Sequence, residues 1–357
     1  MAKPEQFALI LAGGGGTRLW PASRRSRPKQ LLSLGASESL LAATFRRLSA
    51  IVGPERTLIV TAADQVQAIR EALPGLPADN LVVEPAPRNT APAVGLAAAH
   101  VARRAGQDAL LAVVPSDAFI SNEPQYAAVL RIALAQAGQA IVTIGIRPLR
   151  PETGYGYLQT GAKVAGSAEV RQVARFVEKP DLETARAYLA SGEYLWNSGM
   201  FFFSAGRLLA EARQHLPELS ALLDEIATSP DPIALAQECY PRVPAISIDY
   251  GIMEKAHGIR VVPGDFGWSD VGSWAALSEI RPSDVDGNVI SGDAIVKASK
   301  GSVVIAEPGA PLLGVVGVEG IVVVATRDAV LVVPKHRAQE VRSVVDELSA
   351  QGRKQFL

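Results

Sequence analysis

The chain has 357 residues, enough for one large domain and a smaller one. Its 48% hydrophobic and 20% charged residues are typical of a packed globular protein. The 35 Lys and Arg nearly cancel the 36 Asp and Glu, so no basic excess indicates nucleic acid or an anionic membrane as a partner. The single cysteine, Cys239, excludes an internal disulfide and a multi-cysteine zinc site. Because no segment approaches the ~20 apolar residues of a membrane helix, we expect a cytoplasmic protein.

Short apolar, β-branched runs alternate with amphipathic stretches over the first 150 residues. Runs that are apolar on both faces are typical of buried parallel strands, and the ~20–30 residues between them leave room for crossover helices. The predicted strands cover 7–12, 57–61, 80–85, 109–117 and 140–146. This pattern predicts an α/β fold with a Rossmann-like, mostly parallel sheet flanked by helices. Ligands of such sheets bind beyond the carboxyl ends of the strands.

The remainder of the chain changes character at about residue 284. Before that point, strands at 173–180 and 200–205 and helices near 181–191, 206–226 and 232–239 extend the first sheet. After it, short valine-rich runs broken by glycine precede an amphipathic helix over 336–351. We therefore expect a large domain at 1–283 and a small β-rich domain at 284–357, with a β-helix-like coil as one arrangement of its strands.

The strongest functional signal is AGGGGTRLWPASRRSRPKQ at 12–30, directly after the first strand. Consecutive glycines lose much backbone entropy on folding, so they indicate a loop whose amides approach another group. Such amides form a nest for phosphate oxygens, and Arg18 and Lys29 add cationic donors. The alternative is a flexible turn with solvated arginines. The loop lacks the Gly-Lys-Ser/Thr ending of a P-loop and the third glycine of a dinucleotide fingerprint, so it predicts a triphosphate site of another class.

This loop resembles the sugar-phosphate nucleotidylyltransferase superfamily, and its TRLWP and PKQ strings are most similar to the mannose 1-phosphate guanylyltransferase branch. The resemblance extends over roughly residues 7–280 through EPAPRNTAPA (84–93), VVPSDAFI (113–120), ETGYGYL (152–158), FVEKP (176–180), LWNSGMFFF (195–203), SIDYGIMEK (247–255) and WSDVGSW (268–274). It implies transfer of GMP from GTP to α-D-mannose 1-phosphate, giving GDP-mannose and pyrophosphate. Another nucleotide sugar as product, and a regulatory homologue without catalysis, are the alternatives.

The resemblance implies that the nucleotide contacts the glycine loop and the ends of the third and fourth predicted strands. Arg88, Asn89 and Thr90 offer donors and acceptors for a guanine edge, and a helix N-terminus capped by Asn89 or Thr90 is compatible with that role. The expected nucleotide-binding residues are Ala12, Gly13, Gly14, Gly15, Gly16, Thr17, Glu84, Arg88, Asn89, Thr90 and Ser116.

Two aspartates are the candidate ligands of a catalytic Mg²⁺. Asp117 ends the fourth predicted strand, and Asp270 lies in WSDVGSW. Mg²⁺ is bound by one or two carboxylates together with substrate phosphates, although an isolated Asp at a strand end is otherwise a cap or turn residue. The resemblance implies that both aspartates act in catalysis, with Arg18 and Lys29 neutralising phosphate charge.

In the sugar half, the resemblance implies that Gly154 and Tyr155 lie beside the hexose, that Glu178 and Asn197 bind its hydroxyls, and that Lys179 neutralises the sugar phosphate. A solvated strand end is the alternative for Glu178 and Lys179. The expected partners are GTP and mannose 1-phosphate, without nucleic acid or membrane. Because its valine-rich strands need a covered face or a paired edge, we expect the tail to serve assembly, as a homodimer, rather than chemistry.

Overall fold

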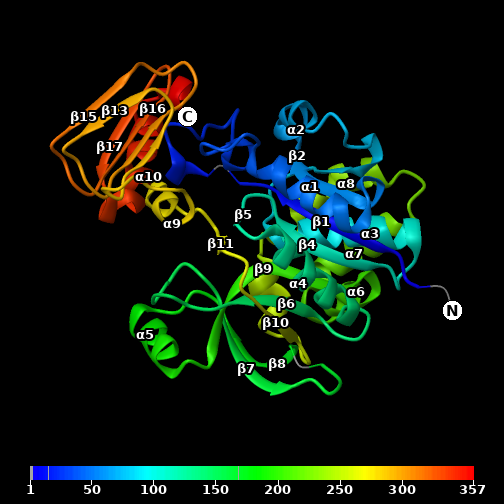
Figure 1. The fold of residues 1–357 in the computed structure, drawn as a ribbon. Helices are drawn as coiled ribbons and strands as arrows, with labels where there is room; N and C mark the ends of the chain where they lie inside the picture. The colour runs from blue at the N-terminus through cyan, green and yellow to red at the C-terminus, as the bar shows by residue number, and fades with distance from the viewer. Residues whose placement is uncertain (1–2, 15, 168) are drawn as a thin grey trace.

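The computed structural model describes residues 3–14, 16–167 and 169–357. They form a large α/β domain with a smaller β-rich domain beside it (Figure 1). The large domain contains a nine-stranded sheet in the order β3-β2-β1-β4-β9-β6-β10-β8-β7. Its strands are β1 (Gln6–Ala12), β2 (Thr57–Ala62), β3 (Leu81–Glu84), β4 (Leu110–Pro115), β6 (Val142–Ile146), β7 (Tyr157–Lys163), β8 (Arg171–Val177), β9 (Tyr194–Ser204) and β10 (Arg260–Gly264).

The sheet has a parallel half and a mixed half, in which β10 runs parallel to β6. Strands β1 to β4 run parallel, with Ile10 of β1 paired to Ile59 on one side and to Val114 on the other. These strands confirm the prediction made from the apolar runs. In the other half, β9 runs antiparallel between β4 and β6, and a β7–β8 hairpin forms the far edge. The sequence patterns did not predict β7, whose exposed end lacks an apolar run.

Helices pack on both faces of the sheet, because β1 is apolar on both. Ala8 and Ile10 face one core cluster with α1, α2 and α4, whereas Phe7 and Leu9 face another with α3 and α6. The helices are α1 (Leu40–Val52), α2 (Val66–Ala72), α3 (Thr90–Ala105), α4 (Glu123–Gln136), α5 (Leu182–Ser191), α6 (Ala205–His215), α7 (Pro217–Thr228), α8 (Pro232–Cys239), α9 (Leu277–Ile280) and α10 (Val341–Ala350).

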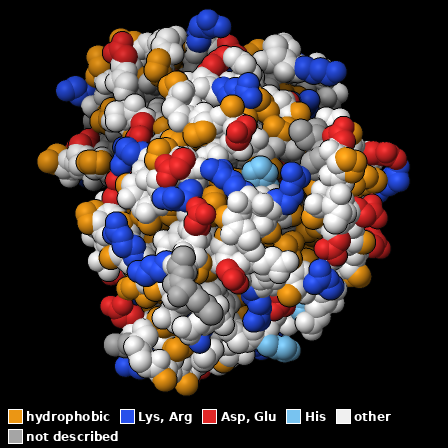
Figure 2. Space-filling view, turned by 90° about the vertical axis from the view of Figure 1, so that its right-hand side faces the viewer, with side chains coloured by type: hydrophobic (Ala, Val, Ile, Leu, Met, Phe, Trp, Pro, Cys, Tyr) orange, Lys and Arg blue, Asp and Glu red, His pale blue; other side chains and the backbone are white. Residues whose placement is uncertain are grey.

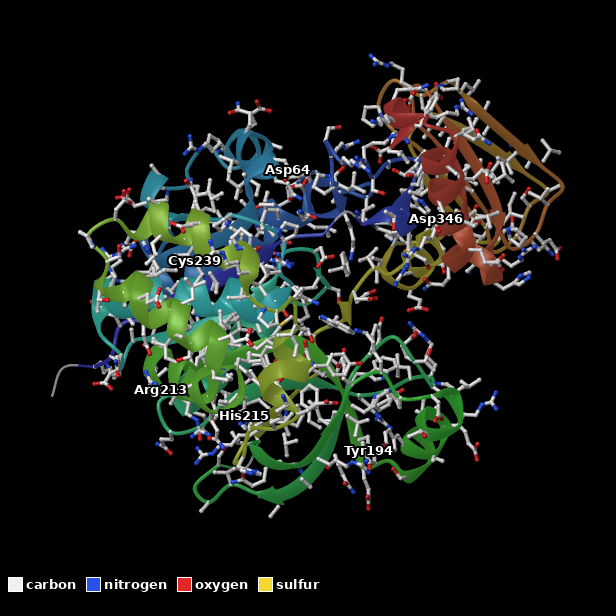
Figure 3. All side chains as sticks on the ribbon, turned by 180° about the vertical axis from the view of Figure 1, so that it is seen from behind. Asp64, Tyr194, Arg213, His215, Cys239 and Asp346 are labelled. Carbon is white, nitrogen blue, oxygen red and sulfur yellow. The ribbon has the colours of Figure 1, made fainter. Side chains whose placement is uncertain are left out.

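One predicted helix, 206–226, is divided into α6 and α7. The break falls at Leu216, because Pro217 has no amide hydrogen to continue α6 and instead starts α7 at a position that favours proline. Cys239, which has no expected role, ends α8 on the side of the large domain away from the β-rich domain (Figure 3).

The β-rich domain is a short coil of parallel strands. One sheet contains β12 (Val289–Ser291), β14 (Val303–Ala306) and β16 (Ile321–Ala325), all parallel, and a second contains β13 (Ala294–Lys297) and β15 (Leu313–Val316). The chain alternates between the two sheets, which is the β-helix-like arrangement. Strand β17 (Val330–Pro334) then returns antiparallel to β16. It leads through a 3-10 segment, Lys335–Glu340, into α10, so the α-helix begins five residues later than the sequence pattern predicted.

The two domains share a hydrophobic core. Leu19 and Trp20, which follow the glycine loop, pack in one buried cluster with Trp274 and with valines of β14 and β16. The indole N–H of Trp20 also donates to the carbonyl of Phe356 at 2.9 Å, and Arg24 pairs with Asp328 at 3.0 Å. The β-rich domain therefore lies against the segment that follows the glycine loop.

The surface carries both charge signs. On the face shown in Figure 2, acidic and basic side chains are interspersed, in keeping with the near-zero net charge of the chain. Within residues 3–14, 16–167 and 169–357, the structure contains no helix with the length and apolar character needed to span a membrane.

Candidate active site

The glycine loop follows β1 at the carboxyl edge of the parallel strands. Gly13 and Gly14 are exposed, Gly15 lies outside the described residues, and Thr17 begins a short 3-10 turn, Thr17–Leu19. Gly16 has φ 57°, and a Cβ at this position would collide with the Cβ of Lys29. A glycine is therefore required at 16, because it lets the Pro28–Lys29 turn pack directly on the loop.

Lys29 joins the two predicted metal ligands. Its ammonium donates to Oδ2 of Asp117 at 2.7 Å and also to the backbone carbonyl of Asp270. The Lys29 side chain is 11% exposed and that of Asp117 is 36% exposed, so water reaches the carboxylate more than the ammonium. Asp117 follows β4, whereas Asp270 follows the short strand β11 (Trp268–Ser269), which pairs with β5 (Phe119–Ile120) just beyond Asp117. This pairing brings together two residues that are far apart in the sequence.

Tyr155 connects this group to the sugar half. Its hydroxyl donates to Oδ1 of Asp270 at 2.5 Å, and its backbone carbonyl accepts from the amide of Lys179 at 3.2 Å. The ring packs edge-on against Trp196 and Trp268. Burial, followed by the negative charge of Asp270, raises the pKa of Tyr155, so the phenol keeps its proton and stays a donor. The hydrogen bond fixes one carboxylate oxygen of Asp270.

A strained residue follows Asp270. Val271 has φ 45°, which is an outlier for a β-branched residue and costs on the order of 1–3 kcal/mol. Its side chain is fully buried in the core shared with the β-rich domain. This packing holds the turn in which the carbonyl of Asp270 accepts from Lys29 and its Oδ1 accepts from the amide of Gly272 at 3.1 Å.

A pocket of about 710 Å³ opens beside these residues, and both domains line it. From the large domain it is lined by Arg18, Gly154, Tyr155 and Asp270, which the sequence predicted, among other residues. The wall from the β-rich domain was not predicted and consists of Gly320, Lys335, His336, Ala338 and Gln339.

The second part of the site consists of four polar residues, here called the sugar-side cluster: Glu178, Lys179, Asn197 and Asp249. The sequence predicted the first three. The amide of Asn197 donates to Oδ1 of Asp249 at 3.0 Å, and the ammonium of Lys179 lies 2.9 Å from Oε1 of Glu178. Oε2 of Glu178 is buried without a hydrogen-bond partner among the described residues. A buried acceptor of this kind is suited to a ligand hydroxyl, because an unpaired polar group is costly.

Sequence reasoning missed two members of this region. Asp249 begins the π-helical turn Asp249–Met253, and burial, followed by the charge of Glu178, raises its pKa to about 6. A Cβ on Gly156 would lie 2.5 Å from Oε2 of Glu178, so glycine at this position leaves room for the carboxylate. Asp249 lies in SIDYGIMEK and Gly156 in ETGYGYL, two segments that carried the family resemblance. Nothing in the spacing of these segments distinguishes the two residues from their neighbours.

The segment expected to select the base is built differently. Asn89 has φ 67° and caps α3 by accepting from the amide of Thr90 at 2.8 Å, while the Thr90 hydroxyl accepts from the Ile248 amide at 2.8 Å. Glu84 is buried and accepts from the Tyr240 hydroxyl at 2.6 Å, and burial raises the pKa of Glu84. The capping role was expected. The hydrogen bond from Tyr240 joins Glu84 to the segment that follows α8.

The other predicted nucleotide contacts are placed along the same edge. Arg88 donates to the carbonyl of Pro241, but its Nε is buried without a partner among the described residues. Ser116 is 2% exposed, and its amide donates to the Leu11 carbonyl at 3.1 Å. The carbonyl of Ala12 accepts from the Thr61 hydroxyl at 2.9 Å. Ser116 and Ala12 therefore support the loop through their backbone.

The parallel strands, the glycine loop and the lysine-bridged aspartates define a phosphate-handling α/β enzyme site. A family model described as nucleotidyl transferase matches residues 7–287, and one described as mannoseP isomerase/GMP-like beta-helix domain matches residues 289–348. The chain belongs to the nucleotidyl transferase family.

Named relatives agree over nearly the whole chain. A mannose-1-phosphate guanylyltransferase of Escherichia coli is 42% identical over 99% of this chain and 75% of its own length. The xanthan biosynthesis protein XanB of Xanthomonas campestris is 43% identical over 97% of this chain and 73% of its own. A solved structure from Thermus thermophilus, described as a mannose-1-phosphate geranyltransferase, is 38% identical, with a TM-score of 0.88, and covers 97% of this chain and 99% of that one.

Proposed function

We propose that this chain transfers GMP from GTP to α-D-mannose 1-phosphate, giving GDP-mannose and pyrophosphate. Family membership and the name of the E. coli relative support the reaction class and the sugar. The structural observation that carries the proposal is the bridge from Lys29 to Asp117 and Asp270. Lys29 packs on the glycine loop at Gly16, and Tyr155 connects Asp270 to Lys179 of the sugar-side cluster. The domain division at about residue 284, the homodimer and the cytoplasmic location remain predictions.

The reaction needs alignment and charge neutralisation more than proton transfer. An oxygen of the sugar phosphate attacks the α-phosphorus of GTP, and the bond from that phosphorus to the β-phosphate oxygen breaks. Its electron pair stays on the departing pyrophosphate, so negative charge grows there. The attacking phosphate is already anionic and needs no general base. We infer that Arg18 and Lys29 stabilise the nucleotide phosphates and that Lys179 stabilises the sugar phosphate.

The residues present suit a Mg²⁺ ion. Asp117 and Asp270 supply hard carboxylate oxygens, and the Lys29 ammonium lies against the Asp117 carboxylate and the Asp270 backbone carbonyl, which supports a cation-binding role for this region. The described residues contain no cluster of three or more His, Cys, Asp or Glu placed to bind a metal, so the substrate phosphates would complete the coordination. When bound, the ion would neutralise charge on the phosphates.

The sugar-side cluster would orient the hexose. The free Oε2 of Glu178 can accept from a sugar hydroxyl, and the amide of Asn197 is held in place by Asp249. Tyr155 contacts both this cluster and Asp270, and Gly154 lines the pocket with it. The arrangement would bring the sugar phosphate beside the α-phosphate, which lowers the entropic part of the barrier.

Pyrophosphate release tests the proposal. The full chain is incubated with Mg²⁺, with GTP or ATP, and with a panel of sugar 1-phosphates that includes mannose, glucose and N-acetylglucosamine. We expect release only when sugar phosphate and nucleotide are both present, with the highest rate for GTP and mannose 1-phosphate. A higher rate with another pair would reassign the product, and no release with any pair would favour a regulatory homologue.

A further inference from the structure

We propose that the β-rich domain contributes to the active site by binding the β- and γ-phosphates of the nucleotide, and then the pyrophosphate product, through Lys335 and His336. This inference rests on the proposed function for the identity of the ligand. It replaces a purely structural role for the domain with a direct contact to the leaving group.

The position of these residues follows from the fold. Strand β17 ends at Pro334, and the 3-10 segment Lys335–Glu340 begins at the end of the coil that faces the large domain. The amide of Lys335 donates to the carbonyl of Gly320 at 2.7 Å, which fixes the start of the turn. Lys335 and His336 then line the pocket of about 710 Å³ together with Arg18 and Asp270.

The pocket wall carries both signs of charge, and its cations differ in whether a carboxylate of the described residues pairs with them. Arg150 lies 3.4 Å from Glu152 and 3.3 Å from Glu279, so its positive charge is offset and the three residues together carry one excess negative charge. Asp270 is held by Tyr155 and is the expected metal ligand. Arg18, Lys335 and His336 are the other ionisable residues of the pocket wall.

The ammonium of Lys335 is available for a ligand. Its one hydrogen bond in the described structure is a long one, 3.5 Å, to the carbonyl of Gly301. A phosphate oxygen would give a shorter, charge-assisted bond and would replace that contact without breaking an ion pair. Arg337, the next cation along the turn, is paired with Glu340 at 2.5 Å and is absent from the pocket wall.

The leaving group is the part of the substrate that gains from a cation here. Arg18 follows the glycine loop, and Asp270 marks the predicted metal position near the α-phosphate. The β-rich domain forms the part of the pocket wall that carries Lys335 and His336, and we expect the β- and γ-phosphates to lie between this wall and Arg18. A second cationic wall would stabilise the charge that develops on the pyrophosphate.

Binding of inorganic pyrophosphate tests the inference on the full chain. Calorimetric titrations in the presence of Mg²⁺ compare the unmodified protein with Lys335→Ala, Lys335→Arg and His336→Ala. We expect Lys335→Ala to weaken pyrophosphate binding about tenfold, the scale of one charge-assisted contact, and Lys335→Arg to retain most of it. His336→Ala should weaken it less, and the KM for GTP should rise while that for mannose 1-phosphate stays unchanged.

Lys297→Ala is the matched control, because Lys297 is an exposed lysine on β13 outside the pocket. The inference is wrong if Lys335→Ala and Lys297→Ala bind pyrophosphate with the same affinity. Unchanged affinity in both would show no contact with Lys335, and an equal loss in both would show a general effect of charge. Lys335→Arg keeps the test valid should Lys335→Ala fold poorly. Failure of the proposed function is distinguishable, because the titration needs no turnover by any sugar phosphate.

Discussion

The two sides of the site are supported in different ways. The sugar-side cluster lies within the large domain and is held together by its own contacts, such as the hydrogen bond from the buried Asn197 to Asp249. The glycine loop is exposed, and the segment that carries Arg18 and Lys29 is supported by contacts with the β-rich domain. Arg27, two residues before Lys29, pairs with Glu307 of the β-rich domain at 3.0 Å, and Trp20 enters the shared core.

This difference indicates which property each side controls. In the sugar-side cluster, burial raises the pKa of Asp249, which links stability on that side to pH. The phosphate side handles charge near the surface, so changes there should affect turnover while leaving the fold nearly intact. Its geometry, however, extends into the second domain through the segment that carries Lys29.

The largest expected effect is on turnover after changes to Asp117 or Asp270. We expect Asp117→Asn and Asp270→Asn each to lower kcat by about 10²-fold or more, since each removes charge that would hold the metal against the phosphates. The thermal midpoint should change little for Asp117→Asn, whose side chain is 36% exposed. Steady-state rates across a Mg²⁺ series measure the effect.

Asp64→Asn is the control for this pair, because Asp64 is exposed on the turn before α2 (Figure 3). Normal turnover by Asp270→Asn at low Mg²⁺, together with an inactive Asp117→Asn, would disprove joint metal binding. Asp270 would then be a structural residue of the strained turn.

The next effect is on stability at the sugar side. The pKa of Asp249 is raised from 3.8 to about 6, so the native state favours its protonated form, and this contribution to stability is lost as pH rises through about 6. Asp249→Asn removes the ionisation and should stabilise the fold at pH 8 by on the order of 2 kcal/mol. Near pH 4 the gain should largely disappear. Urea unfolding at both pH values measures it.

The same variant should weaken sugar binding, which separates stability from function at this position. Asp346→Asn on the exposed face of α10 is the control (Figure 3). An equal gain for Asp249→Asn at pH 4 and pH 8 would show that ionisation of Asp249 does not cause the stability difference.

The sequence predicted the loops at the strand ends better than the contacts that hold those loops in place. Gly16, Lys29 and Asp117 follow strands whose apolar runs are unmistakable, so strand ends and ligand positions could be predicted together. The contact of the Lys29 ammonium with the Asp270 carbonyl depends on a positive φ at Val271, which no local preference of valine predicts. Lys335 could not be predicted from the sequence, because its place in the pocket depends on how the two domains pack together.

A smaller effect concerns the choice of base. The Nε of Arg88 is buried without a partner among the described residues, although the guanidinium donates to the Pro241 carbonyl. An acceptor on guanine would satisfy that donor, so Arg88→Ala should reduce the preference for GTP over ATP by about tenfold. The ratio of kcat/KM for the two nucleotides is the measurement. Equal turnover of both by the unmodified protein would remove the guanine assignment altogether.

The smallest expected effect tests the support that the β-rich domain gives to the phosphate side. Glu307 is 5% exposed at its side chain and Arg27 is 44% exposed, so Arg27→Ala leaves a buried carboxylate without its cation. Because the exposed end of Arg27 is screened by water, we expect a loss of only about 1 kcal/mol in the free energy of unfolding. A modest rise in the KM for GTP should accompany it, since Lys29 lies two residues away.

A double-mutant cycle with Glu307→Gln isolates the pair, because the two changes together should cost less than their sum. Arg342→Ala is the control, since Arg342 pairs with Asp346 at 3.9 Å on the exposed side of α10, with both side chains about two-thirds exposed. If Arg27→Ala changes the KM for GTP no more than Arg342→Ala does, the ion pair stabilises only the domain contact. The phosphate side would then resemble the sugar side in depending on the large domain alone, and the shared core around Trp20 and Val271 would be a packing feature without influence on the nucleotide.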